Sequence, residues 1–190
     1  MIDQKAQDDF YRNVWQSNIH LFKHSGDNLV DEINKLNPKL VIDAGCGINF
    51  LKGKIKNLIG YDPVFEKEAD IVCGHWDAPF KSECADVILA LGSVNWGNHD
   101  DIANMLIKLK SWLKPGGRLY MRGAPGGYKN DQGLTWFQWG TKEIDQFARL
   151  MDFDVERVEI EYNLTGPDGG TLPERLWPHR YVWLYRRKEI

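Results

Sequence analysis

The stretch that decides the fold reads Leu40-Val41-Ile42-Asp43-Ala44-Gly45-Cys46-Gly47-Ile48-Asn49-Phe50. An apolar run stops at an acid and two closely spaced glycines, which predicts a buried strand, a tight turn and the start of a helix. Because glycine has no Cβ, such a turn lets the backbone approach a ligand closely. The stretch therefore predicts a nucleotide-type binding turn.

The spacing of the glycines separates two classes of nucleotide-binding protein. A dinucleotide site requires a third small residue so that the helix packs on the strand, but Phe50 holds that position here, which argues against a nicotinamide-dependent oxidoreductase. The pattern that matches is Asp-x-Gly-x-Gly, from Asp43 through Gly45 to Gly47. It resembles the first motif of class I S-adenosylmethionine-dependent methyltransferases. The resemblance implies that these residues and Cys46 contact S-adenosylmethionine.

Further segments follow in the order of that family over residues 38–123. Leu58 to Asp62 reads as a second strand that ends in an acid, and Asp62 is expected to accept hydrogen bonds from both ribose hydroxyls. Pro63, and Leu91 and Gly92 near the end of the fourth strand, are expected beside the cofactor. The other expected elements are a third strand over Asp70–Gly74, a fourth over Ala85–Trp96, a helix over Asp100–Leu113, a turn at Lys114–Gly117 and a fifth strand over Arg118–Gly123.

The adenine contact departs from the family pattern. The family has an acid a few residues before a Pro-Phe pair, and here Gly74 holds that position before Pro79–Phe80. Either Asp77 reaches the adenine amino group, or backbone groups around His75 and Trp76 make the contact. The ring of Trp76 is expected to lie against the adenine ring.

These elements predict an α/β protein with a three-layer, Rossmann-like methyltransferase fold. Its mostly parallel seven-stranded sheet has an antiparallel last strand and helices on both faces. Too few residues separate Asp62 from the third strand for a normal crossover helix, so one crossover helix is expected to be trimmed. The single domain is expected to comprise an N-terminal helical cap (1–37), a cofactor-binding core (38–123), a candidate lid (124–140), and a last helix with a closing hairpin (141–190).

The last fifty residues supply a helix and two strands. Thr141 is expected to cap a helix that runs through Leu150. Apolar residues over Val155–Tyr162 and Tyr181–Tyr185 predict two antiparallel strands. A closing hairpin of this kind, beside a parallel sheet, is typical of the family.

Two segments outside the core are expected to surround the substrate. The N-terminal helices are expected to cover the cofactor, with Tyr11 and Arg12 over its methionine end and Arg12 pairing with the carboxylate; alternatively, both residues have only packing and surface roles. The glycine-rich candidate lid carries Trp136 and Trp139, which either exclude water from the methyl transfer or cover the core.

Composition limits the class of protein. A chain of 190 residues with a net charge of −3 and 43% hydrophobic residues is expected to form one soluble domain. No apolar run reaches transmembrane length and the N-terminus is not signal-like, so a cytoplasmic protein without a membrane partner is expected. Three cysteines without metal-ligand spacing, and His20 and His24 without further ligands, predict no metal site.

Methyl transfer to an O or N atom of a small or medium-sized molecule is the expected activity. A sulfonium methyl is already electrophilic, so a base is needed only for an acceptor that holds its proton. The candidate bases are Asn95, His99, Tyr128, His75 and His20.

Two alternatives to that activity are methylation of nucleic acid or protein and a non-catalytic, S-adenosylmethionine-binding partner subunit. Nucleic acid is less favoured, because neither an Asn/Asp-Pro-Pro-aromatic motif after the fourth strand nor a Pro-Cys nucleophile is present. The oligomeric state stays open.

Overall fold

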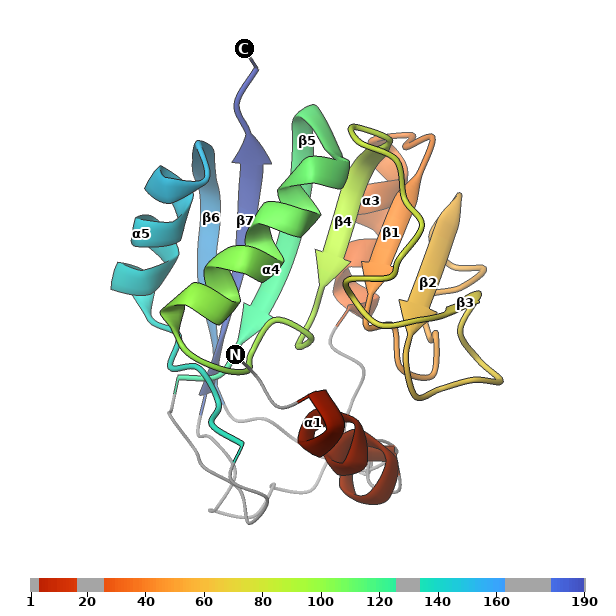
Figure 1. Ribbon diagram of the computed structural model, residues 1–190. Coiled ribbons are helices and arrows are strands. Elements are labelled where there is room, and N and C mark those ends of the chain that lie inside the picture. Colours follow the sequence, from red (N-terminus) through yellow and green to blue (C-terminus); the bar gives the residue numbers. More distant parts are fainter. Residues whose placement is uncertain (1–3, 17–25, 126–133, 163–178, 190) are drawn as a thin grey trace.

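The computed structural model describes residues 4–16, 26–125, 134–162 and 179–189, and its centre is a seven-stranded sheet (Figure 1). The strands follow the order β3-β2-β1-β4-β5-β7-β6. Their bounds are β1 Val41–Ala44, β2 Leu58–Asp62, β3 Ile71–Val72, β4 Ala85–Ala90, β5 Leu113–Gly123, β6 Phe153–Tyr162 and β7 His179–Arg187. β1 to β5 pair in parallel, and β7 pairs antiparallel with both β5 and β6. The expected mixed sheet is confirmed.

Helices cover both faces of the sheet. They are α1 Gln4–Phe10, the π-helical turn Tyr11–Trp15, the 3-10 turn Asp27–Leu29, α3 Val30–Lys35, α4 His99–Trp112 and α5 Thr141–Leu150. α4 and α5 lie on one face and α3 on the other, while α1 lies across the end of the sheet (Figure 1). Apolar residues of α4 and α5 pack with alternate residues of β4, β5 and β7, and the opposite residues of these strands pack with α3. This alternation gives the three expected layers.

The helix expected after the glycine turn does not form. Residues 47–57 make a series of turns, in which Asn49, Gly53 and Asn57 have positive φ angles of 51°, 79° and 56°. A helix requires negative φ at every residue, so these residues prevent one. Leu51 and Ile55 still pack on the sheet in place of a helix face. In the part of the chain that the structure describes, β1–β2, β2–β3 and β3–β4 are all joined without a helix, so the trimming is greater than the single connection expected.

Several element boundaries also differ from expectation. β4 ends at Ala90 rather than Trp96, and α5 takes Gly140 as its N-cap, so Thr141 is its first helical residue and caps nothing. β5 begins at Leu113, so the residues expected to form a turn, Lys114–Gly117, belong to the strand. The pairing of β5 with β4 shifts there, because Ala85 pairs with Leu113 but Val87 pairs with Arg118. Local patterns placed these elements correctly, but their ends depend on tertiary pairing.

The described part of the candidate lid packs on the body of the protein. Trp139 is buried, and its indole N–H donates to the carbonyl oxygen of Val94 at 3.1 Å. Its ring centroid lies 4.7 Å from that of Trp183. Trp139 therefore covers the core, and residues 126–133 of the candidate lid lie outside the described residues. Within the described ranges, no helix has the length and apolar character needed to cross a membrane.

Candidate functional site

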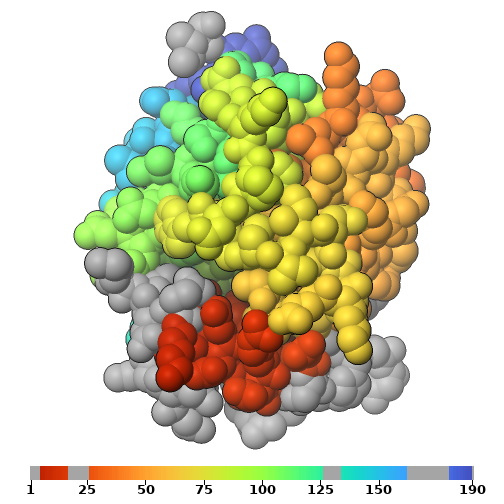
Figure 2. Space-filling view, turned by 45° about the vertical axis from the view of Figure 1, so that its right-hand side comes forward, coloured from red at the N-terminus to blue at the C-terminus, as the bar shows by residue number. Residues whose placement is uncertain are grey.

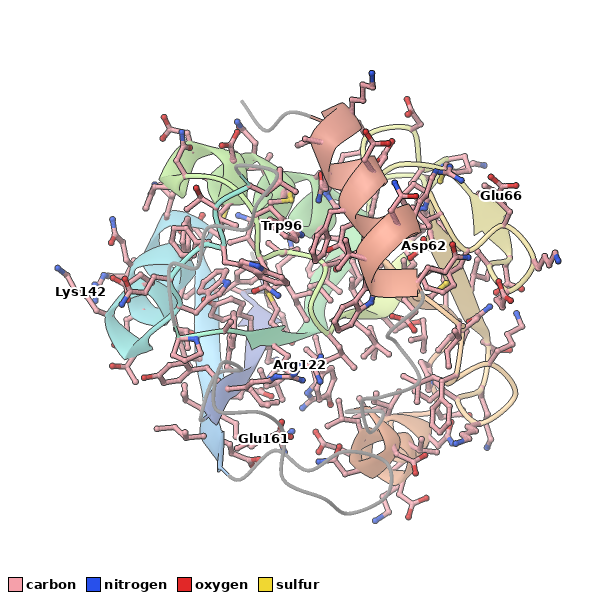
Figure 3. The ribbon with its side chains drawn as sticks, turned by 90° about the horizontal axis from the view of Figure 1, so that it is seen from below. Asp62, Glu66, Trp96, Arg122, Lys142 and Glu161 are labelled. Carbon is pink, nitrogen blue, oxygen red and sulfur yellow. The ribbon has the colours of Figure 1, made fainter. Side chains whose placement is uncertain are left out.

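The predicted cofactor residues meet at one edge of the sheet. β1, β2 and β4 are parallel neighbours, so their carboxyl ends reach the same edge, which we call the carboxyl edge. Asp43 stands in register with Gly60 on β2 and Leu89 on β4. Figure 3 looks onto this edge, with α1 lying across it. Open α/β sheets bind ligands at this edge, where the connections of neighbouring strands diverge.

The glycine turn is fixed from two sides. The backbone N–H groups of Gly45 and Cys46 donate to the carbonyl oxygen of Tyr61 at 2.9 and 3.0 Å. Gly45 has a φ of 71°, and a Cβ added there would lie 2.6 Å from the Cβ of Ser93. Only glycine fits such a position without displacing the loop after β4. The turn is therefore clamped between β2 and that loop.

Asp62 holds the other end of the turn. One carboxylate oxygen, Oδ2, accepts from the N–H of Gly47 at 3.0 Å, and Oδ1 accepts from those of Val64 and Phe65 at 2.8 and 3.1 Å. Burial raises the pKa of Asp62, and these three bonds and Arg12 oppose the rise. A carboxylate has about four acceptor positions, so about one remains, on Oδ2. As placed, Asp62 has room for one ribose hydroxyl rather than the two expected.

Asp43 is a buried acid without a hydrogen-bond donor among the described residues. Burial, and secondarily the nearby charge of Asp62, raise its pKa from 3.8 to about 7. A low-dielectric position next to a second acid disfavours the ionised form, and a nearby cation restores it. The two acids therefore make this part of the edge suited to a positively charged ligand.

The N-terminal segment is joined to the edge by aromatic contacts. The indole N–H of Trp96 donates to the hydroxyl of Tyr11 at 2.6 Å, and Phe10 packs edge-on against Trp96 with centroids 5.1 Å apart. Burial raises the pKa of Tyr11, so its hydroxyl stays protonated near neutral pH. The ring of Trp136 packs against that of Trp96, with the two ring centroids 4.1 Å apart. α1 and the second half of the candidate lid thus meet on one tryptophan.

Arg12 lies beside the segment that follows β2. Its Nη1 is 3.2 Å from Oε1 of Glu66, and its Nη2 donates to the carbonyl oxygen of Pro63 at 3.2 Å. In Figure 2 the N-terminal atoms, in red, adjoin this segment, in yellow. Arg12 therefore stands near Asp62, and its pairing with a methionine carboxylate stays a prediction.

The ring of His75 is engaged on both sides. Its Nε2 lies 3.2 Å from the carbonyl oxygen of Met105, which can only accept, so Nε2 carries the proton. Its Nδ1 then accepts from the hydroxyl of Tyr61 at 2.6 Å. Burial lowers the pKa of His75 to about 4, so the ring is neutral near pH 7. This geometry makes His75 a support for β2 and leaves neither ring nitrogen for an acceptor.

The two adenine candidates lie on the exposed turn after β3. The backbone N–H of Asp77 donates to the carbonyl oxygen of Gly74 at 3.2 Å, and its Oδ2 would lie 3.7 Å from a Cβ added to Gly74. Trp76 is 52% exposed, so its ring face is accessible. The adenine contacts expected of Asp77 and Trp76 stay predictions. The turn presents the acid and the aromatic ring together.

Leu91, Gly92 and Asn95 lie after β4, next to the glycine turn. The amide N–H of Asn95 donates to the carbonyl oxygen of Gly92 at 2.9 Å, while its Oδ1 is buried without a hydrogen-bond partner in the described chain. His99, another candidate base, stacks on Phe147 of α5, with the two ring centroids 4.5 Å apart. Two further candidate bases, Tyr128 and His20, lie outside the described residues.

Arg122 is a residue of this edge that the sequence analysis missed. It is the penultimate residue of β5, and its Nη2 would lie 3.5 Å from a Cβ added to Gly92. Burial and the charge of Arg180 lower its pKa to about 9, against an opposing effect of Glu161. A single arginine in an apolar strand gives no local sequence signal, because only the sheet register brings it beside Gly92.

Metal ligands do not converge at the edge. Among the described residues, no group of three or more His, Cys, Asp or Glu side chains is arranged to hold a metal ion.

Comparison with solved structures agrees with the fold. The fold is similar to that of 1,6-didemethyltoxoflavin-N1-methyltransferase from Burkholderia thailandensis, with a TM-score of 0.68 and 16% identity over 98% of this chain and 86% of that one. The chain has the class I methyltransferase fold.

Two further structures match this chain over almost the whole of their own chains. Magnesium protoporphyrin IX methyltransferase from Synechocystis gives a TM-score of 0.69 at 13% identity, over 98% of this chain and 100% of that one. The possible histamine N-methyltransferase from Thermotoga maritima gives 0.61 at 17% identity, over 97% and 99%. The Burkholderia and Synechocystis structures contain bound S-adenosylhomocysteine. No protein-family model and no curated protein sequence matches the chain.

Proposed function

We propose that the protein binds S-adenosylmethionine at the carboxyl edge and transfers its methyl group to an O or N atom of a small or medium-sized acceptor. The observation that carries the proposal is the placement of the glycine turn between two buried acids, Asp43 and Asp62, in a methyltransferase fold. The acids match the positive charge of the cofactor, and the turn lets it approach the backbone closely.

Each part of the cofactor has a candidate partner at the edge. The remaining acceptor position of Asp62 suits a ribose hydroxyl, and the turn that carries Trp76 and Asp77 lies next to β2 for the adenine. The charge of Asp43 suits the cationic methionine end. Leu91 and Gly92 follow β4, the strand next to β1, and are proposed to face the sulfur.

The chemistry needed from the chain is alignment rather than covalent catalysis. Bound S-adenosylmethionine supplies an electrophilic methyl group, so the protein must hold an acceptor in line with the S–C bond and exclude water. Trp96 closes one side of the edge under α1. Asn95, whose Nδ2 donates to Gly92 and whose Oδ1 has no partner in the described chain, is proposed to hold an acceptor N–H or O–H group by hydrogen bonding.

Calorimetric titration tests the cofactor. Micromolar binding of S-adenosylmethionine and S-adenosylhomocysteine, without binding of NAD, is expected; the reverse preference would overturn the proposal. Asp145→Asn, an exposed acid on α5, is the matched control for variants of the buried acids.

Incubation with methyl-labelled cofactor and fractionated cell extract tests the acceptor. Label in the small-molecule fraction is expected. Label in RNA or protein would reassign the substrate class, and cofactor binding without label in any fraction would favour a non-catalytic partner subunit.

A further inference from the structure

Arg122 presents a cation at the acceptor side of the carboxyl edge. It stands on β5 in register with Val182 of β7, on the same face of the sheet as Tyr120 and α3. Its guanidinium lies against Gly92 in the loop after β4, since a Cβ added to Gly92 would lie 3.5 Å from Nη2. Figure 3 shows Arg122 and Glu161 on the β6–β7 side of the edge, away from Asp62.

This guanidinium has no hydrogen bond or ion pair with any residue of the described ranges. Five other arginines of those ranges do form ion pairs, such as Arg118 with Glu156 at 3.1 Å. Glu161, the acid that acts on it electrostatically, stands directly opposite Arg180 across β6 and β7. Two arginines thus face one acid. A half-buried guanidinium without a paired acceptor costs free energy, which a bound anion recovers.

Polar atoms of the loop that follows β4 also lack partners in the described structure. Oδ1 of Asn95 and Oγ of Ser93 are both buried and unpartnered, and both residues belong to the loop that begins at Gly92. A Cβ on Gly92 would lie 3.9 Å from Nδ2 of Asn95 as well as 3.5 Å from Arg122. Buried polar atoms are rarely left unpaired in proteins, so Arg122 and Asn95 beside Gly92, with Ser93 next along the chain and against Gly45, indicate a site for a polar ligand.

The position of this group separates it from the ribose end of the cofactor. β5 lies two strands from β1 and three from β2, or about 10 and about 14 Å at the usual spacing of parallel strands. A group bound by Arg122 is therefore far from Asp62 and beyond β4, the strand that faces the sulfur in the proposed cofactor position.

We propose that Arg122 binds an anionic oxygen group, a carboxylate or a phosphate, on the methyl acceptor. A guanidinium matches the planar pair of carboxylate oxygens through two parallel N–H bonds, which also fixes the orientation of the molecule that carries them. The anion anchors one end of the acceptor at β5, and Asn95 and Ser93 contact the part nearer the methyl group. The inference rests on the proposed function, since it assigns the substrate class of the same site.

The test uses a pair of probes that differ in charge. Benzoate and the neutral benzamide are titrated into protein saturated with S-adenosylhomocysteine, and inorganic phosphate is titrated as a second anion. Wild-type protein is expected to bind benzoate at least about tenfold more tightly than benzamide, the scale of a charge-assisted hydrogen bond. Equal affinity for the two probes, or binding of none of the three, would overturn the inference.

Variants then identify the residue and the source of the anion. Arg122→Gln is expected to lower benzoate affinity by about tenfold or more, with Arg122→Lys intermediate and Arg149→Gln, an exposed arginine on α5, like the wild type. The affinity for S-adenosylhomocysteine should stay within about twofold in all of them. A comparable loss of S-adenosylhomocysteine affinity in Arg122→Gln would show that Arg122 binds the methionine carboxylate instead, and would refute the acceptor assignment.

Two readouts keep this result distinct from other failures. Arg122→Gln should melt at or above the wild-type temperature, since no described ion pair is lost; a strongly lowered melting temperature would show a structural role and overturn the inference. If wild-type protein binds no S-adenosylhomocysteine, the proposed function fails first. If it binds S-adenosylhomocysteine and ignores the charge of the probe, the acceptor inference alone fails.

Discussion

Replacing Asp43 by Asn should change how cofactor affinity depends on pH. Because the pKa of Asp43 in the free protein is about 7, roughly one carboxyl in eleven is ionised at about pH 6 and ten in eleven at about pH 8. A cation bound beside a buried acid lowers its pKa by about one to three units. Binding is then linked to loss of a proton, and S-adenosylmethionine affinity should rise about five- to tenfold from pH 6 to pH 8.

Isothermal titration at several pH values measures this change. The amino group of the cofactor titrates near pH 8 itself, so the informative quantity is the ratio of wild-type to Asp43→Asn affinity at each pH, from which the ligand contribution cancels. That ratio should rise with pH, and Asp145→Asn should show no such trend relative to wild type. A ratio that stays constant from pH 6 to pH 8 would refute the role of Asp43 as the charge that meets the cofactor.

Thermal unfolding of the ligand-free protein checks the cause of the raised pKa. Folding moves the pKa of Asp43 up from 3.8 to about 7, so the ionised carboxylate destabilises the fold, by roughly 4 kcal/mol at most. This destabilisation is absent below about pH 4 and complete above about pH 7. Asp43→Asn should therefore raise the melting temperature relative to wild type at pH 8 and have little effect at pH 4.

Substitutions at three further positions separate binding from folding. Asp62→Asn keeps one side-chain oxygen for the backbone N–H groups and should weaken cofactor binding by about 1 to 3 kcal/mol, whereas Asp62→Ala should also lower the melting temperature; equal melting of both variants would count against the clamping of the turn. Gly45→Ala forces a Cβ against Ser93 and should lower both stability and cofactor affinity, and an unchanged unfolding midpoint in urea would contradict the clash. Trp139→Ala should cost about 3 to 5 kcal/mol of unfolding free energy, as for a buried tryptophan, and a loss of activity at unchanged stability would restore its assignment to a lid.

Local patterns accounted for elements that are long and periodic. The α4 helix was predicted at Asp100–Leu113 and spans His99–Trp112, and α5 runs to Leu150 as expected. Apolar strands that end in an acid were found at β1 and β2 for the same reason, since each carries its own signal within about five residues. The connection after the glycine turn was mistaken for a helix, because isolated left-handed asparagines at 49 and 57 look like ordinary polar residues in the sequence.

The sequence by itself determined the fold class and the place of two acids near the carboxyl ends of β1 and β2. Asp43 and Asp62 are each marked by position at a strand end, and parallel pairing of the two strands necessarily brings such ends together. Phe50 excluded the dinucleotide pattern on the same local grounds.

Only the tertiary structure decided the state and surroundings of those residues. Burial without a donor raises the pKa of Asp43 to about 7, and three backbone N–H groups occupy most of the Asp62 carboxylate. Register across β4 and β5 brings Arg122 beside Gly92, thirty residues earlier in the chain. Desolvation depends on what packs around a side chain, and register depends on how distant strands pair. Neither can be predicted from a short stretch of sequence.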